Sequence, residues 1–295
     1  MKMTKLATSV LLGGAMLTAS VGVSAAPFYL VVPDGTGNDG MTAVSAQLGI
    51  DFGATSVYTD DVDNSYDGSD VTTWVTVGDL VEDTGSGSVS SLIKPDGTGD
   101  SWTGINNTEG LGQDWNLSFE YTIFGEVVAV DPTGLPSALG IGALYDSGVI
   151  EITYNTLDAD GSVVTSTRIM DLVVSASSGT IGNVNIFAAV DFSSAEIDAT
   201  LADGFFFFAD GNLDFYDLWL AGEPLPNIVI TARIDTNVDP QYVPECDDDD
   251  CTTVSRSNTL NGSVQFDPVP VPGTLFLLGA GLLGLGWSRR SARRA

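Results

Sequence analysis

Oxygen-bearing side chains recur at alternate positions in one short stretch of the chain. The candidate ligands in this stretch are Asp61, Asp63, Ser65, Asp67 and Asp70. Carboxylate and hydroxyl oxygens at this spacing, with Gly68 to turn the backbone, suit a loop that binds Ca²⁺. Counting from Asp63, the twelfth position holds Trp74 instead of the glutamate of an EF-hand, and no helical pattern flanks it. The stretch therefore predicts an irregular Ca²⁺ loop, and a simple solvated turn is the alternative.

Catalysis by histidine is excluded, because the chain contains no histidine. Its absence removes Ser-His-Asp and Cys-His mechanisms and histidine-bound zinc. Carboxylate chemistry remains, and a glycoside hydrolase needs two carboxylates that converge across the scissile bond. Glu120, Glu126 and Glu151 lie on strand-like segments whose neighbours indicate a solvated face. Among thirty-nine acidic residues some pairs arise by chance, so we expect a protein that is not an enzyme; an extracellular carboxylate-based glycoside hydrolase is the alternative.

Three tryptophans are candidates for stacking on a sugar ring. Trp102 is the best of them, because Ser, Thr, Gly and Asn surround it and indicate exposure. Trp74 and Trp115 lie in strand-like runs, where packing in the core is the expected role.

Short apolar and β-branched runs alternate with Gly, Asp, Asn and Ser through the body of the chain, which is typical of an all-β protein. The predicted strands are 41–52, 56–59, 72–81, 115–130, 149–156, 162–176, 183–192, 204–209, 227–235 and 252–266, and residues 85–91 are predicted to form a loop. In 115–123 the odd positions are apolar and the even ones polar, so one face is buried and one is wet. The tract Phe205 to Phe208 lacks this alternation, which favours a strand covered on both sides. We predict an antiparallel two-sheet β-sandwich, jelly-roll-like, with a wholly closed barrel as the alternative.

The charge of the body is extreme. All thirty-nine acidic residues lie between Asp34 and Asp267, against four basic ones, which gives a net charge of −35. The four basic residues are Lys94, Arg168, Arg233 and Arg256. Nucleic acids and anionic headgroups are bound through cationic side chains, so neither is an expected partner. Such a surface favours solubility and attracts divalent cations.

Both ends of the chain indicate export. Lys2 and Lys5 precede an apolar run and the small residues before Pro27, so residues 1–25 are predicted to be a signal peptide. An acidic β-sandwich domain is predicted over 26–267, and the tail 268–295 follows. In this compartment Cys246 and Cys251, which bracket four aspartates, are expected to form a disulfide, with a metal site as the alternative.

The tail has three parts. The first is the Pro-x-Pro motif Pro270, Val271, Pro272, Gly273 and Thr274. The second is the Gly- and Leu-rich apolar segment 275–287, predicted to form a short hydrophobic helix that inserts in the inner membrane. The third is the arginine cluster Arg289, Arg290, Arg293 and Arg294. These arginines are the stop-transfer charges that stay cytoplasmic, so the body is left outside the cell.

This tripartite tail resembles the sorting signal of PEP-CTERM proteins, although Val271 stands where the usual glutamate would be. The resemblance implies processing by an exosortase, a membrane cysteine protease that removes the tail, in a Gram-negative bacterium that makes exopolysaccharide.

Four short segments of the body carry a second resemblance: 58–61, 204–211, 233–239 and 256–263. Through them the body is similar to the flocculation-associated PEP-CTERM proteins. This resemblance implies a secreted cell-surface or matrix protein that retains exopolysaccharide and so promotes flocculation or biofilm. Ca²⁺ bridging between acidic loops and anionic sugars is the mechanism that we expect, because divalent ions relieve the repulsion of so acidic a body.

Overall fold

The computed structural model of the chain describes residues 25–33, 40–60, 75–102, 109–131, 140–180, 183–222, 228–235, 243–245 and 253–269. Most of these residues are in strands. The strands are β1 (Phe28–Leu30), β2 (Gln47–Thr59), β3 (Leu80–Ile93), β4 (Trp115–Asp131), β5 (Gly140–Leu157), β6 (Val163–Thr180), β7 (Asn183–Asp191), β8 (Phe206–Phe208), β9 (Leu213–Asp214), β10 (Ile228–Asp235), β11 (Val243–Glu245) and β12 (Thr253–Pro268). Two short helices, α1 (Ala199–Ala202) and α2 (Phe215–Gly222), lie on either side of β8 and β9 in the chain.

The strands form two antiparallel sheets, which confirms the predicted all-β architecture. The smaller sheet has the order β1, β8, β9. The larger has the order β10, β7, β6, β5, β4, β3, β2, β12, β11, and β10 also pairs with β12. This last pairing runs from Ile228 opposite Pro268 to Asp235 opposite Asn261, so it joins the sheet to itself. Opposite halves of the closed sheet face each other across the core as the layers of a sandwich do.

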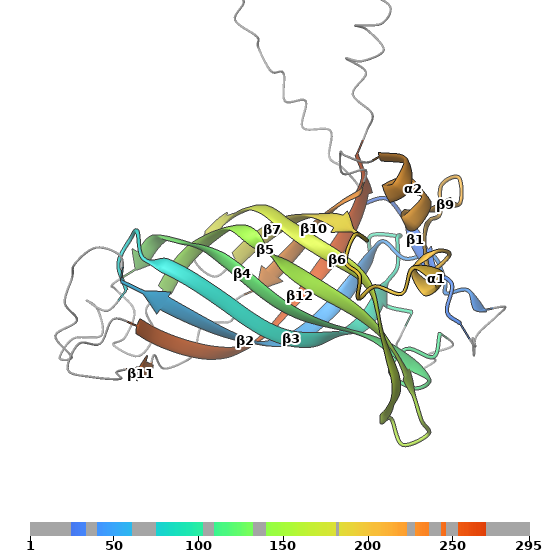
Figure 1. Ribbon diagram of the computed structural model, residues 1–295, viewed down its shortest axis with the longest axis horizontal. Coiled ribbons are helices and arrows are strands. Elements are labelled where there is room, and N and C mark those ends of the chain that lie inside the picture. Colours follow the sequence, from blue (N-terminus) through green and yellow to red (C-terminus); the bar gives the residue numbers. More distant parts are fainter. Residues whose placement is uncertain are drawn as a thin grey trace, which may run out of the picture.

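The closed sheet is an up-and-down meander, since the strands from β2 to β7 each pair with the next one along the chain (Figure 1). Its connectivity therefore differs from the crossing connections of a jelly roll. The closure corresponds to the barrel that the sequence left as the alternative. Because the strands carry apolar and polar residues alternately, closure places one apolar set inside and one polar set outside.

A small cap covers one end of the closed sheet, where Figure 1 shows β1, β9, α1 and α2 together. The phenylalanine tract supplies its centre: Phe205, Phe206 and Phe208 are buried, as predicted. The ring of Phe206 lies 5.6 Å from that of Phe266 on β12, centroid to centroid. The Asp214 carboxylate at the start of α2 accepts hydrogen bonds from backbone amides, including that of Gly204 at 2.7 Å. The cap is thus joined to the main sheet through aromatic contacts.

The predicted loop over 85–91 is wrong, because these residues are the middle of β3. Its glycines are required by packing. A Cβ at Gly85 would lie 2.7 Å from the Tyr121 ring, and one at Gly87 would lie 2.3 Å from the Cβ of Phe52. The aromatic side chains of the neighbouring strands occupy the space where side chains at Gly85 and Gly87 would lie. Glycine inside a strand often marks such a close approach.

The other predicted strands agree with the structure in type and differ in their ends. The segments 41–52 and 56–59 belong largely to one strand, β2, which begins only at Gln47. Residues 75–79 of the predicted strand 72–81 precede β3 and form a turn, whereas 72–74 lie outside the described residues. The sequence of 213–220 favours one or two helical turns, and α2 covers most of this stretch.

Candidate functional site

The outer face of the closed sheet has a polar hollow around Arg233. Arg233 is exposed on β10, opposite Ser263 of β12 and Asn185 of β7. The hollow has a volume of about 390 Å³. Its wall consists of Gln47, Gly49, Ile50, Asp51, Ser90, Ser91, Ile93, Asn183, Arg233, Asn261, Gly262 and Ser263. Gly49 leaves this surface low because it has no side chain on the outer face of β2.

Arg233 differs from the other three basic residues of the body. Within the residues that the structure describes, it takes part in no ion pair, whereas Arg168 forms three. The Lys94 ammonium lies 4.7 Å from the centroid of the Trp102 ring, and the Arg256 guanidinium lies 5.4 Å from that of Tyr58. The Arg233 guanidinium is exposed, and it lines the hollow beside amide and hydroxyl groups and the Asp51 carboxylate. A guanidinium pairs with a carboxylate through two parallel hydrogen bonds.

A second outer hollow is acidic. Glu120 of β4 and Glu151 of β5 are direct partners across the two strands and line this hollow together with Thr84, Ser86 and Thr122. Their side chains leave from positions that ordinarily place the Cβ atoms about 5 Å apart. Two of the three glutamates that are candidates for a glycoside hydrolase, Glu120 and Glu151, are therefore neighbours on the outer face. Glu126 lies opposite Leu144, six residues farther along β4, which is roughly 20 Å away at the rise of a strand.

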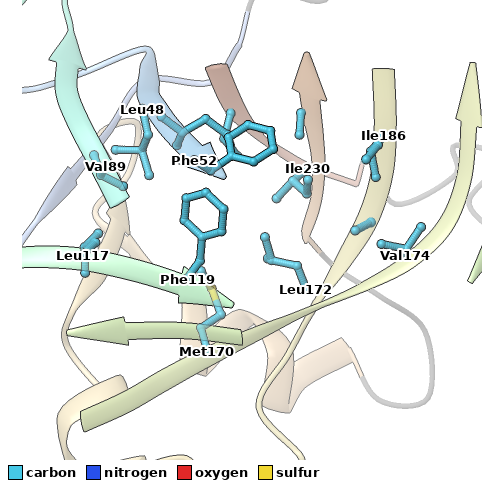
Figure 2. Close-up of a cluster of buried hydrophobic side chains, with 14 of the residues drawn as sticks. Leu48, Phe52, Val89, Leu117, Phe119, Met170, Leu172, Val174, Ile186 and Ile230 are labelled. Carbon is cyan, nitrogen blue, oxygen red and sulfur yellow. The ribbon is translucent and has the colours of Figure 1, made fainter. Parts of the chain in front are cut away.

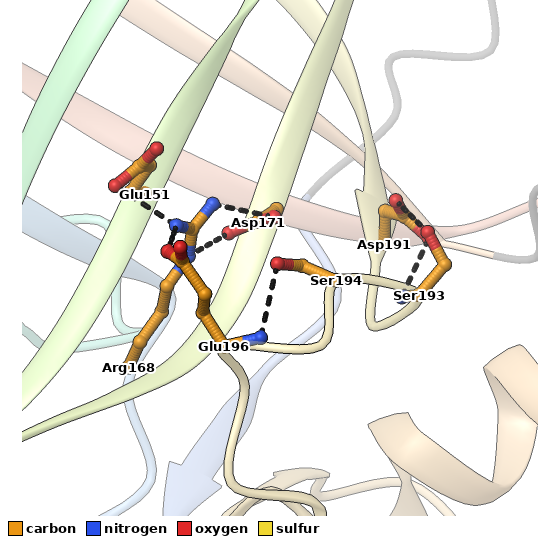
Figure 3. A network of polar contacts seen from close by, with 7 residues as sticks. All are labelled: Glu151, Arg168, Asp171, Asp191, Ser193, Ser194 and Glu196. Carbon is orange, nitrogen blue, oxygen red and sulfur yellow. Dashed lines mark hydrogen bonds and ion pairs between the residues drawn. The ribbon is translucent and has the colours of Figure 1, made fainter.

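The Glu151 carboxylate is already engaged by an ion-pair cluster on the outside of β6 (Figure 3). Arg168 binds Asp171 through Nε–Oδ1 and Nη2–Oδ2, both at 2.8 Å, and its Nη1 lies 3.1 Å from Glu151 and 2.6 Å from Glu196. The hydrogen bonds to Asp171 are the main reason that the pKa of the Arg168 guanidinium is raised above its usual value. The cluster joins β5, β6 and the segment before α1. Its geometry is that of a structural clamp.

A buried polar cluster lies inside the closed sheet, at the end away from the cap. The Asp83 carboxylate on β3 accepts hydrogen bonds from Tyr145 (2.9 Å), Ser56 (3.0 Å) and Tyr121 (3.1 Å). Burial raises the pKa of the Asp83 carboxyl above its usual value, although these hydrogen bonds and the charge of Arg256 act in the opposite direction. Burial and the nearby Asp83 likewise raise the pKa of Tyr145. These three hydrogen bonds tie β2, β3, β4 and β5 together.

The tryptophans partly follow expectation. Trp115 is buried in the core, as predicted, and its indole N–H donates to the Glu109 carbonyl at 2.8 Å. Trp102 is half-buried; its N–H donates to the Val44 carbonyl at 3.0 Å, and Lys94 lies over its ring. Sugar contact at Trp102 stays a prediction.

Most of the other predicted site residues lie outside the described residues. These are the calcium-loop residues Asp61 to Asp70, the cysteines 246 and 251, the sorting motif 270–274 and the arginines 289–294. In the ranges that the structure does describe, no three acidic side chains gather as a metal site. The part of the chain covered by those ranges also includes no helix long and apolar enough to cross a membrane. The calcium and disulfide predictions therefore stay predictions.

Sequence reasoning did not identify the Arg233 hollow. In the sequence Arg233 is one of four cations in the body, and its neighbours in the hollow, Asp51, Asn183 and Asn261, come from three other segments. Only the closure between β10 and β12 brings them together.

Comparison with known proteins identifies the tail. A family model described as the PEP-CTERM protein-sorting motif matches residues 268–290. Searches of curated proteins and of solved structures find no match to the chain. The match confirms the predicted sorting signal over residues 268–290 of the tail.

Proposed function

We propose that this PEP-CTERM protein, which its sorting motif marks as an exported, exosortase-processed surface protein, retains exopolysaccharide at the cell and so promotes flocculation or biofilm. The observation that carries the polysaccharide part is the Arg233 hollow. An exposed guanidinium, the amides of Asn183 and Asn261 and the hydroxyl of Ser263 line this one hollow of the outer face. Guanidinium groups select carboxylates, and amide and hydroxyl groups match the hydroxyls of sugar rings.

Electrostatics sets a condition on this binding. A body of net charge −35 repels anionic polysaccharide except where a local cation is exposed. Divalent cations reduce this repulsion and bridge carboxylates of the protein to those of the sugar. We therefore include Ca²⁺ bridging in the proposal, through the acidic loop 61–70.

The protein acts without catalysis in this proposal. Of the three candidate glutamates, Glu126 is remote from the other two, and Glu151 is held by Arg168. Hydrolysis is the second candidate function only because the Glu120–Glu151 pair exists.

The test is a binding assay with the exported protein and polysaccharide extracted from the host bacterium. Wild-type protein is expected to co-sediment with the polysaccharide, more strongly with Ca²⁺ than with a chelator. Arg233→Gln is expected to weaken binding at least tenfold, and Arg233→Lys, which keeps the charge without the planar fork, to weaken it less. Equal binding by all three proteins would refute the role of the Arg233 hollow.

The same samples separate binding from hydrolysis. Reducing ends released from the polysaccharide are measured for wild type, Glu120→Gln and Glu151→Gln. We expect no release above that of a protein-free control. Release by wild type that either substitution abolishes would favour the glycoside hydrolase.

A further inference from the structure

The closed sheet encloses an apolar cavity of about 60 Å³ near its middle. Figure 2 shows part of the lining, including Phe52, Phe119, Leu172 and Ile230. The lining comes from eight strands of the closed sheet and from Phe206 of the cap. Its side chains include those of Leu48, Phe52, Phe119, Ile150, Ile152, Met170, Leu172, Ala232, Ile234 and Phe266.

A second observation also indicates that the interior of the closed sheet is incompletely filled. Ile150, Ile152 and Ile234 point into the closed sheet and line the cavity, yet each is only partly buried. Protein interiors ordinarily pack as densely as organic crystals, and voids larger than a water molecule are few. An interior that leaves three inward-facing isoleucines accessible has room for another apolar group.

The two ends of the interior differ. Phe206 and Phe266 close the cavity on the side of the cap, with ring centroids 5.6 Å apart. On the other side, Tyr121 contributes its ring to the wall while its hydroxyl donates to Asp83. The wall presents apolar atoms to the cavity, and the Tyr121 hydroxyl is hydrogen-bonded within the protein.

We propose that this cavity binds a small apolar group, the end of an unbranched alkyl chain. A water molecule in such a cavity lacks the two to four polar partners it needs, whereas an apolar group gains dispersion contacts on every side. A cavity of about 150 Å³ holds benzene, so the present volume corresponds to about two or three carbons. Eight-stranded closed sheets have interiors just wide enough for side chains or for one small ligand, which fits a narrow occupant.

Methionine methyl groups report on this binding directly. The exported protein has two methionines after the predicted signal peptide: Met170 in the cavity wall and Met41 on the surface. The protein is labelled with ¹³C at its methionine methyl groups and titrated with 1-butanol, and separately with its compact isomer tert-butanol. Met41 is the internal control for effects of the alcohol as a solvent.

The expected result is a saturable shift of the Met170 signal with 1-butanol, at concentrations on the order of millimolar for so small a ligand, and no shift of Met41. The branched isomer is expected to bind at least tenfold more weakly. Ala232→Leu places a larger side chain in the wall and is expected to abolish the Met170 shift while the protein stays folded. If that variant does not fold, the two titrations of wild type decide alone. The proposal is overturned by an unshifted Met170, by parallel unsaturable shifts of both methionines, or by equal binding of the two alcohols.

Discussion

Removing the charge of Arg168 should destabilise the protein far more than removing any one of its exposed partners. Asp171 is only 6% exposed and receives two hydrogen bonds of 2.8 Å from the guanidinium. Arg168→Met leaves this carboxylate buried without its counter-charge. Breaking a buried ion pair from one side costs about 3–5 kcal/mol, and we expect about 3 kcal/mol because Arg168 itself is 15% exposed.

The matched control is Glu196→Gln, at the other end of the same guanidinium. Glu196 is 75% exposed, and an exposed pair contributes at most about 1 kcal/mol even at 2.6 Å. Urea unfolding of the exported protein measures both changes. For a body of this size, about 3 kcal/mol corresponds to a fall in melting temperature of roughly 6–12 °C.

A double variant separates the lost pair from damage to packing. In Arg168→Met combined with Asp171→Leu no buried charge remains, and apolar replacement of a buried pair is often neutral. We expect the double variant to recover most of the loss. A single variant Arg168→Met within about 1 kcal/mol of wild type, or a double variant no better than the single one, would refute this account of the clamp.

Three further predictions concern the interior. Gly87→Ala should cost about 1–3 kcal/mol, because its Cβ would overlap Phe52, whereas Ser86→Ala on the exposed face should be nearly neutral; denaturant titration compares them. Phe206→Ala should cost about 3–5 kcal/mol and the half-buried Phe207→Ala clearly less, and equal losses would contradict the role of Phe206 as the centre of the cap. Burial raises the pKa of the Asp83 carboxyl, so the folded protein binds the carboxyl proton more tightly than the unfolded chain does. The contribution of Asp83 to the free energy of unfolding therefore rises as the pH falls from the pKa of the folded state toward the lower pKa of the unfolded state. Asp83→Asn should therefore gain least, or lose most, relative to wild type at the acidic end of a series of melting curves from pH 7 to pH 4; a pH-independent difference would refute this.

The sequence predicts where the strands lie better than it predicts how the sheet closes on itself. The alternation of apolar and polar residues over 115–123 predicts correctly where β4 begins and which of its faces is buried. Such alternation is a local property of the sequence. The serines and glycines of 85–91 resemble turn formers, and only the rings of Tyr121 and Phe119 across the pair explain why they form a strand. Closure depends on the pairing of β10 with β12, between segments whose contact no local pattern records.

The sites also differ in how far the sequence predicts them, because some are contiguous in the chain and others are formed by several strands. The sorting tail is contiguous, so its motif is legible in the sequence and residues 268–290 match a known signal. The Arg233 hollow and the apolar cavity each combine several strands, and their geometry exists only in the closed sheet. The inward-facing isoleucines have the same alternating pattern whether the space between them is filled or empty.

The most direct test of the central proposal is the amount of polysaccharide that stays with the cells when the gene is deleted. Cell-bound polysaccharide and floc size are measured in the deletion strain and after complementation with the full chain or with a chain lacking residues 268–295. Retention at the surface predicts that deletion lowers both quantities, that the full chain restores both, and that the tailless chain restores neither fully. Unchanged cell-bound polysaccharide in the deletion strain would contradict the proposed function.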